Sequence, residues 1–288
     1  ILPLPMLAGA LLLIFLMTVI NFVGIKEATW FNTLSTFIEF LGLLIIIALG
    51  IKYFGSVDLL EMPTGLLGVF ESSALVFFAY IGFESIVKLR EETKNPEKVI
   101  PKALILSILI TAVVYVLVAI AAVSVIGWEA LSASDAPLAD VATAALGNGY
   151  AGIALAIIAL FSTANTVLIA MVTGSRQVYG MAKQKSLPKI FAKVHPKTRT
   201  PWIAVIFFFF ATSAFAFIGD IHTVANITNI FIFITFAMVN LSVIILRYKF
   251  KKKRGFLIPG NIGKFSVLAA IGFASSLVML GFVITSLL

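Results

Sequence analysis

Long apolar segments alternate with short polar ones along the whole chain. About 20 apolar residues in a helix, each adding about 1.5 Å, cross the roughly 30 Å hydrocarbon core of a bilayer. By this measure the sequence predicts eight membrane-spanning helices. The predicted segments are 6–25, 31–51, 66–87, 103–126, 151–174, 202–219, 223–246 and 265–287.

The third segment differs from the others because polar residues interrupt it. Gly82 and Glu84 stand in the run Val76-Phe-Phe-Ala-Tyr-Ile-Gly-Phe-Glu84, and a long polar stretch follows at 88–101. A helix in lipid must satisfy its own backbone, so such an interruption needs a protein or water neighbour. Interrupted membrane helices are typical of transport sites. We therefore predict a break in this helix and a binding function there.

Composition supports a membrane protein. Of the 288 residues, 61% are hydrophobic and only 12% are charged, whereas soluble domains are about half apolar and a quarter charged. Six Trp and Tyr residues stand at the ends of the apolar segments, where membrane proteins place their aromatic belts: Trp30, Tyr53, Trp128, Tyr150, Trp202 and Tyr248. We therefore predict an all-α, polytopic protein embedded in a lipid bilayer.

Basic residues gather on one side of the predicted membrane. When the loops are assigned alternately to the two sides, all of the 21 Lys and Arg residues except Lys52 fall on the same side. The positive-inside rule places that side, with loops 88–102, 176–200 and 247–264, in the cytoplasm. We predict a multi-pass protein of the cell membrane. The net charge of +8 is thus a signal of orientation and no evidence for nucleic-acid binding.

Residue types needed for enzyme or cofactor chemistry are scarce. The chain has no cysteine, and His195 and His222 fall in different loops, so they cannot share a metal cluster. Neither a phosphate-binding P-loop nor a Ser-His-Asp or HExxH arrangement is present. We predict neither an enzyme nor a bound cofactor. Because Ile1 opens directly into an apolar run without a charged leader, we expect a fragment that lacks its true N-terminus, not a signal peptide.

Two carboxylates lie within the predicted segments. Glu39 is near the middle of 31–51, and Glu84 is closer to the cytoplasmic end of 66–87. A charge in the bilayer centre costs between about 3 and more than 10 kcal/mol, so each group needs a cavity or must be neutral. Each is a candidate proton or cation site. The alternative is a neutral Glu that is hydrogen-bonded between helices and serves packing.

Two later segments carry uncharged polar side chains. In 151–174, Ser162 and Thr166 are four residues apart and Asn165 is adjacent, so all three share one helix face. The segment 223–246 has a comparable set: Asn226, Thr228 and Asn229. Such side chains either line a cavity or join helices by hydrogen bonds.

The residues around the break resemble those of the amino acid–polyamine–organocation (APC) family of permeases. The resemblance rests on Phe77-Phe-Ala-Tyr-Ile-Gly-Phe-Glu-Ser85 and on 91–103, and 21–26, 175–188 and 247–260 agree in order and spacing. It implies a LeuT-type fold with two inverted repeats, in which the eight segments match helices 4 to 11 of twelve. In that arrangement, 1–52 ends the first repeat, 66–248 forms the second, and 264–288 is an additional helix.

The resemblance also implies roles for single residues. The third segment would be unwound, and its backbone would meet the substrate's amino group in half of the binding site, with Phe78 capping the substrate. The residues of this half-site are Phe78, Ala79, Tyr80, Ile81 and Gly82. Glu84 matches a carboxylate linked in some members to pH dependence. Glu39 stands where one sodium-independent branch has a lysine, so that lysine mechanism does not carry over, and Ser162 and Thr163 would lie near Glu39.

Together, these features predict a secondary active transporter of amino acids that works by alternating access, as a proton-coupled symporter or exchanger. The predicted coupling site consists of Glu39, Glu84, Ser162 and Thr163, with Asn165 and Thr166 as further polar residues of the cavity. Three alternatives stay open: sodium coupling, a polyamine or other organic cation as substrate, and a structural or channel-like membrane subunit.

Overall fold

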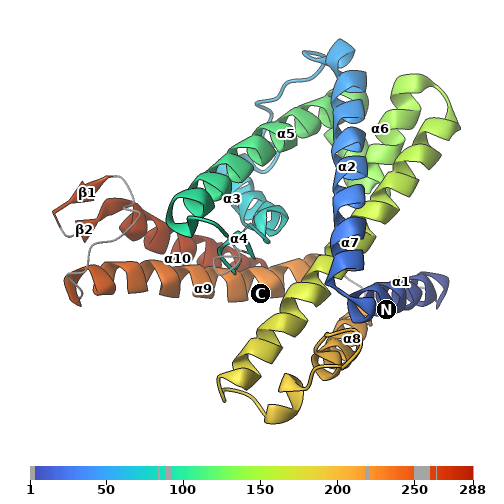
Figure 1. Ribbon diagram of the computed structural model, residues 1–288. Helices are drawn as coiled ribbons and strands as arrows, with labels where there is room; N and C mark the ends of the chain where they lie inside the picture. Colours follow the sequence, from blue (N-terminus) through green and yellow to red (C-terminus); the bar gives the residue numbers. More distant parts are fainter. Residues whose placement is uncertain are drawn as a thin grey trace. The chain divides into compact units, whose positions relative to one another are not determined.

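The structure is a computed structural model of the chain. It describes residues 4–83, 85–88, 93–217, 221–249, 260–263 and 265–287. Helices make up nearly all of this part, together with one short hairpin (Figure 1). The chain forms two compact units, Ile1–Leu59 with Val113–Gly219 and Leu60–Ala112 with Asp220–Leu288.

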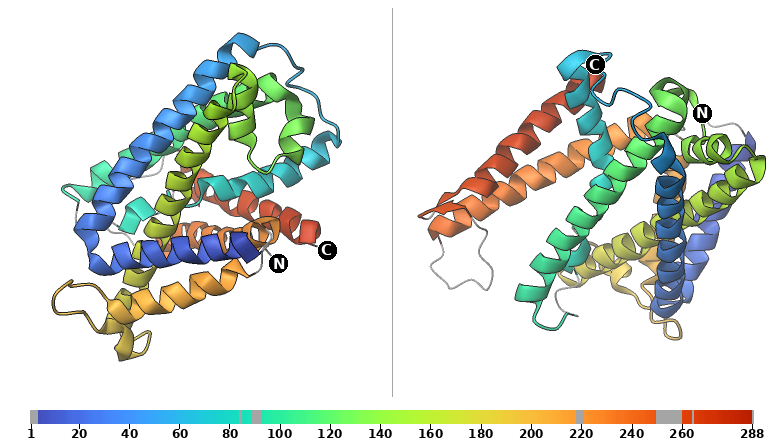
Figure 2. Two further views of the ribbon diagram at one scale, coloured as in Figure 1. Left: turned by 90° about the vertical axis from the view of Figure 1, so that its right-hand side faces the viewer. Right: turned by 90° about the horizontal axis from the view of Figure 1, so that it is seen from above.

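The first unit is built around the long helix α7 (Gly149–Lys183). The other helices of this unit are α1 (Leu4–Val23), α2 (Ile25–Gly50), the second part of α5 (Pro96–Ala133), α6 (Pro137–Leu146) and α8 (Trp202–Ala216), with 3-10 turns at Ile51–Tyr53 and Lys189–Ala192. Helix α7 packs against α1, α2, α6 and α8, and its crossing with α2 is visible in Figures 1 and 2. Its start is fixed by Asn148, whose side chain accepts a hydrogen bond from the amide of Ala151 at 3.1 Å.

Two apolar clusters hold the first unit together. Leu168 and Met171 of α7 pack with Ile14 and Met17 of α1 in one cluster. In the other, Ile46 of α2 meets buried side chains of α5, α6 and α7. Helix α7 takes part in both clusters and therefore fixes the position of α2 along its length.

The second unit is built on α9 (Ile221–Lys249) and α10 (Val267–Leu287), which run side by side (Figures 1 and 2). The antiparallel strands β1 (Asn261–Ile262) and β2 (Phe265–Ser266) lie between them in the chain. Helix α3 (Gly65–Val76) packs against both helices. The core here contains Ala74 of α3, Phe233 of α9 and Val283 of α10. The first part of α5 completes the unit.

Six helices of the described residues are long and apolar enough to cross a membrane. They are Leu4–Val23, Ile25–Tyr53, Pro96–Ala133, Gly149–Lys183, His222–Lys249 and Val267–Thr285. Many of their large apolar side chains are exposed, including Leu109 and Val113 of α5, as expected for helices that meet lipid. These six correspond to six of the eight predicted segments.

The other two predicted segments form shorter helices. Segment 202–219 becomes α8, whose 15 residues reach only about 22 Å, and its predicted end at 218–219 lies outside the described residues. Segment 66–87 is interrupted, as the next section describes. Helix α5 is longer than the predicted 103–126 because it starts at Pro96 and continues past a kink at Gly127, whose φ of 77° suits glycine.

Candidate functional site

The predicted break is present in segment 66–87. Helix α3 ends at Val76, a 3-10 turn covers Phe77–Tyr80, and the short helix α4 (Ser85–Lys88) follows. Ile81 is extended, and Gly82 has a φ of 118°. An added Cβ at Gly82 would meet no atom within 4 Å, so this position favours glycine because of its backbone conformation and not for lack of space.

The predicted substrate-binding residues lie on this interruption. Phe78, Ala79 and Gly82 are exposed, and Tyr80 and Ile81 are half-buried. Tyr80 also borders an apolar hollow of about 500 Å³, which is lined by Phe77, Tyr80, Phe83, Val87, Leu104, Ile108 and Phe236. Glu84, the predicted carboxylate at this end, lies outside the described residues.

Helix α9 holds the start of the break. The ring of Phe77 lies 4.7 Å from that of Phe233 and 6.0 Å from that of Phe236, measured between centroids. Asn229, one turn before Phe233, donates from its side-chain amide to the carbonyl oxygens of Ala74 and Leu75 at 2.9 and 3.4 Å. The sequence marked Asn229 as either a cavity or a packing residue and did not place it beside the break.

A second polar cluster lies in the first unit, between α2 and α7. The side-chain amide of Asn165 donates to a carboxylate oxygen of Glu39 at 3.2 Å and approaches Thr36 Oγ1 at 3.5 Å. The Thr36 hydroxyl itself donates to the carbonyl of Asn32. Asn165 is buried and Glu39 is half-buried. Asn165, predicted as a secondary cavity residue, is therefore the direct partner of Glu39.

Glu39 also lines a hollow of about 570 Å³ in the same unit. Ser162 and Thr163 line it too, so the three residues predicted to lie together do so. The Thr163 hydroxyl donates to the carbonyl of Ala159 in its own helix. Thr166 is exposed and is not among the lining residues.

Asp135 was missed by the sequence analysis. It precedes α6 and lines the hollow that Glu39 lines. Because it lies in a polar loop outside any apolar segment, its position gave no signal of a shared cavity. The lining of the hollow thus includes two carboxylate residues, Glu39 and Asp135, and three hydroxyl residues, Tyr115, Ser162 and Thr163. Such a set of oxygen atoms suits a proton or a cation. Among the described residues, no group of three or more His, Cys, Asp or Glu side chains could hold a metal ion.

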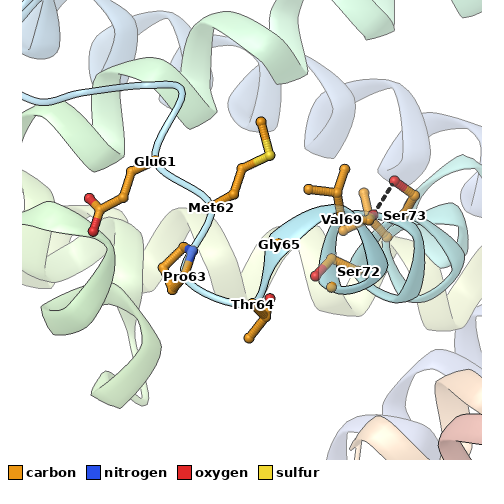
Figure 3. A pocket seen from close by; sticks show the side chains of 10 residues that line it. Glu61, Met62, Pro63, Thr64, Gly65, Val69, Ser72 and Ser73 are labelled. Atoms are coloured by element: carbon orange, nitrogen blue, oxygen red, sulfur yellow. Dashed lines mark hydrogen bonds between the residues drawn. The ribbon is translucent and has the colours of Figure 1, made fainter.

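A third hollow, of about 360 Å³, opens at the start of α3 (Figure 3). Its polar lining includes Glu61, Thr64, Ser72 and Ser73. Figure 3 shows Glu61 pointing away from α3, and the Ser73 hydroxyl donates to the carbonyl of Val69 at 2.7 Å. No residue of the predicted site lines this hollow.

Comparison with known proteins shows to which family the chain belongs. A family model described as amino acid permease matches residues 3–287. The chain belongs to the amino acid permease family. This confirms the resemblance and the prediction of an all-α, multi-pass membrane protein, and the family consists of transporters and not enzymes.

The relatives of this permease chain are named for different substrates. It is 32% identical to the branched-chain amino acid permease BcaP of Bacillus subtilis, over 87% of this chain and 54% of the relative. It is 30% identical to the methylthioribose transporter of the same organism, with the same coverage. It is also 30% identical to the vacuolar cationic amino acid transporter 2 of Arabidopsis thaliana, over 83% of this chain and 38% of the relative. The chain thus spans about half the length of these relatives, or less.

Proposed function

We propose that the protein transports an amino acid across the cytoplasmic membrane by alternating access, as a proton-coupled symporter or exchanger. The observation that carries the proposal is the interruption of an apolar helix at residues 77–83. An interrupted helix leaves backbone amide and carbonyl groups without their helical partners, and in a membrane such groups line a protein cavity or bind a ligand. Membership of the amino acid permease family supports this choice.

The residues Phe78 to Gly82 form one half of the proposed substrate site. The backbone of this segment meets the ammonium group of the amino acid, and the side chain of Phe78, which is 40% exposed, covers the substrate. In this proposal, 1–52 ends the first repeat, 66–248 forms the second and 264–288 adds a helix. The basic loops 88–102, 176–200 and 247–264 face the cytoplasm.

Glu39 is the proposed proton site. It lies within a helix that is apolar enough to span the membrane, and no basic side chain is recorded as its partner in the described part of the chain. The amide of Asn165 stabilises its ionised form. When the hollow is closed to water the neutral form is favoured, so a change of access drives proton uptake and release. Ser162 and Thr163 offer further oxygen atoms.

A cationic substrate is the alternative that one observation favours. Asp135 adds a second carboxylate to the wall that carries Glu39, and two carboxylates suit an amine with more than one positive charge. A neutral amino acid requires no such pair. Competition by lysine, arginine and polyamines distinguishes the two substrates.

The test uses the full-length protein in proteoliposomes with labelled amino acids. We expect saturable uptake that an inwardly directed proton gradient accelerates and that replacement of sodium leaves unchanged. Glu39→Gln should abolish the acceleration by the gradient, whereas Thr173→Val, on α7 with its hydroxyl bonded to its own helix, should keep it. If Glu39→Gln leaves both the uptake rate and its pH dependence intact, Glu39 is not the coupling group. A channel-like subunit would show no counterflow of labelled substrate.

A further inference from the structure

Asn229 makes an unusual contact for a polar residue in a membrane helix. Its side chain is fully buried, with 0% of its surface exposed. It does not bond its own helix, as Asn240 does with the carbonyl of Phe236. Its amide instead reaches α3 and donates to two carbonyls in the last turn of that helix, those of Ala74 and Leu75.

These two carbonyls decide whether α3 continues as a helix. In an uninterrupted α-helix they would accept hydrogen bonds from the amides of residues 78 and 79. Those residues lie in the 3-10 turn Phe77–Tyr80. The Leu75 carbonyl also accepts a hydrogen bond from the amide of Phe77, so the shorter contact of Asn229 with the Ala74 carbonyl carries the argument. A carbonyl left without any partner in the apolar interior costs about 1–3 kcal/mol. A side-chain donor at this point therefore lowers the cost of the break relative to a continuous helix.

Neighbouring residues of α9 reinforce this placement. Phe233 lies one turn after Asn229 on the same helix face, and its ring packs on Phe77, the first residue of the 3-10 turn. The end of α3 is thus held by a polar contact on its carbonyls and an aromatic contact on the next residue. Both contacts belong to the second unit.

We infer that Asn229 is a positioning residue that stabilises the interruption of α3 by occupying the carbonyls of Ala74 and Leu75. Its loss lets the helix extend into residues 77–81 and removes backbone groups from the substrate half-site. The effect on transport rests on the proposed function, whereas the effect on the backbone does not.

The experiment compares variants of the full-length protein in two measurements. Asn229→Leu removes the donor at similar size, Asn229→Gln retains an amide, and Asn240→Leu is the matched control from the same helix. Hydrogen exchange of peptides covering residues 74–83 reports on the break. Uptake in proteoliposomes gives KM and the maximal rate for whichever amino acid the wild type carries.

For Asn229→Leu we expect slower amide exchange confined to residues 77–81 and a KM raised about tenfold, with a maximal rate within about threefold of wild type. Asn229→Gln should restore at least part of both, and Asn240→Leu should change neither. Unchanged exchange at 77–81 in Asn229→Leu, or an equal change in Asn240→Leu, would overturn the inference. If Asn229→Leu does not fold, Asn229→Ala also removes the donor and provides the same comparison. Absence of amino acid uptake by the wild type would refute the proposed function, and the exchange measurement would still decide the role of Asn229.

Discussion

The contact between Asn165 and Glu39 predicts a measurable coupling energy between two helices. The perturbation is a double-mutant cycle of Glu39→Met, Asn165→Leu and the double variant, each removing the polar group at similar size. In the structure the two side chains are joined by one hydrogen bond of 3.2 Å. Residues in direct contact usually show interaction energies of about 0.5–3 kcal/mol, whereas distant pairs are additive within about 0.5 kcal/mol.

The protonation state of Glu39 sets the expected size of this coupling. A net hydrogen bond between neutral groups is worth about 0.5–1.5 kcal/mol, and one to a charged group about 1.5–3 kcal/mol. Because 3.2 Å is at the long end for an N–H···O bond, we expect the lower end of each range. The coupling should therefore rise from about 0.5 to about 1.5 kcal/mol as the pH is raised and the carboxyl group ionises.

The assay is reversible unfolding of the purified full-length variants in mixed detergent micelles over a series of pH values. Thr173→Val in place of Asn165→Leu gives the control cycle, since the Thr173 hydroxyl donates to its own helix. That cycle should be additive. A coupling below about 0.5 kcal/mol at every pH would show that the two side chains do not interact and would remove Asn165 from the proposed proton site.

Two further predictions concern glycines. Gly50→Ala should destabilise the first unit by about 1–3 kcal/mol, because the new Cβ would lie 2.7 Å from the backbone Cα of Ala121. We expect a lower melting temperature of the purified protein. Gly9→Ala is the control and should leave the melting temperature unchanged, because nothing lies within 4 Å of its new Cβ. Gly82→Ala should cost about 1–3 kcal/mol in backbone strain, because Gly82 has a φ of 118°. It should therefore weaken substrate binding, which equilibrium binding of labelled substrate measures. If the Gly82→Ala variant binds substrate as tightly as the control variant Gly180→Ala in α7, the prediction is wrong.

The sequence was sufficient to predict the break in segment 66–87 and to single out Glu39 as a carboxylate within an apolar helix. Gly82 followed by Glu84 and the polar stretch 88–101 departs from the expected pattern of a continuous membrane helix, because polar residues interrupt the apolar segment. Glu39 stands out in the same way, since a carboxylate within an apolar segment requires a partner. Both are visible from the sequence because the bilayer penalises polar groups irrespective of what lies beside them.

The partners of these groups could not be predicted, because they depend on how helices pack. Asn165 and Asn229 look alike in sequence, because each is an amide side chain within an apolar segment. Only the crossing of α2 with α7 brings Asn165 to Glu39, and only the packing of α9 on α3 brings Asn229 to Ala74.

The two asparagines share a property that bears on their roles. Each uses its amide nitrogen as a donor, while its buried carbonyl oxygen has no hydrogen-bond partner among the described residues. An unpartnered buried atom does not by itself distinguish these two residues, because Ser35 and Ser124 also have one among the described residues. What distinguishes them is the partner of the donor end: Asn165 contacts the carboxylate of the proposed proton site, and Asn229 contacts the last turn of α3, next to the proposed substrate half-site. These contacts favour positioning of functional groups over simple packing for Asn165 and Asn229.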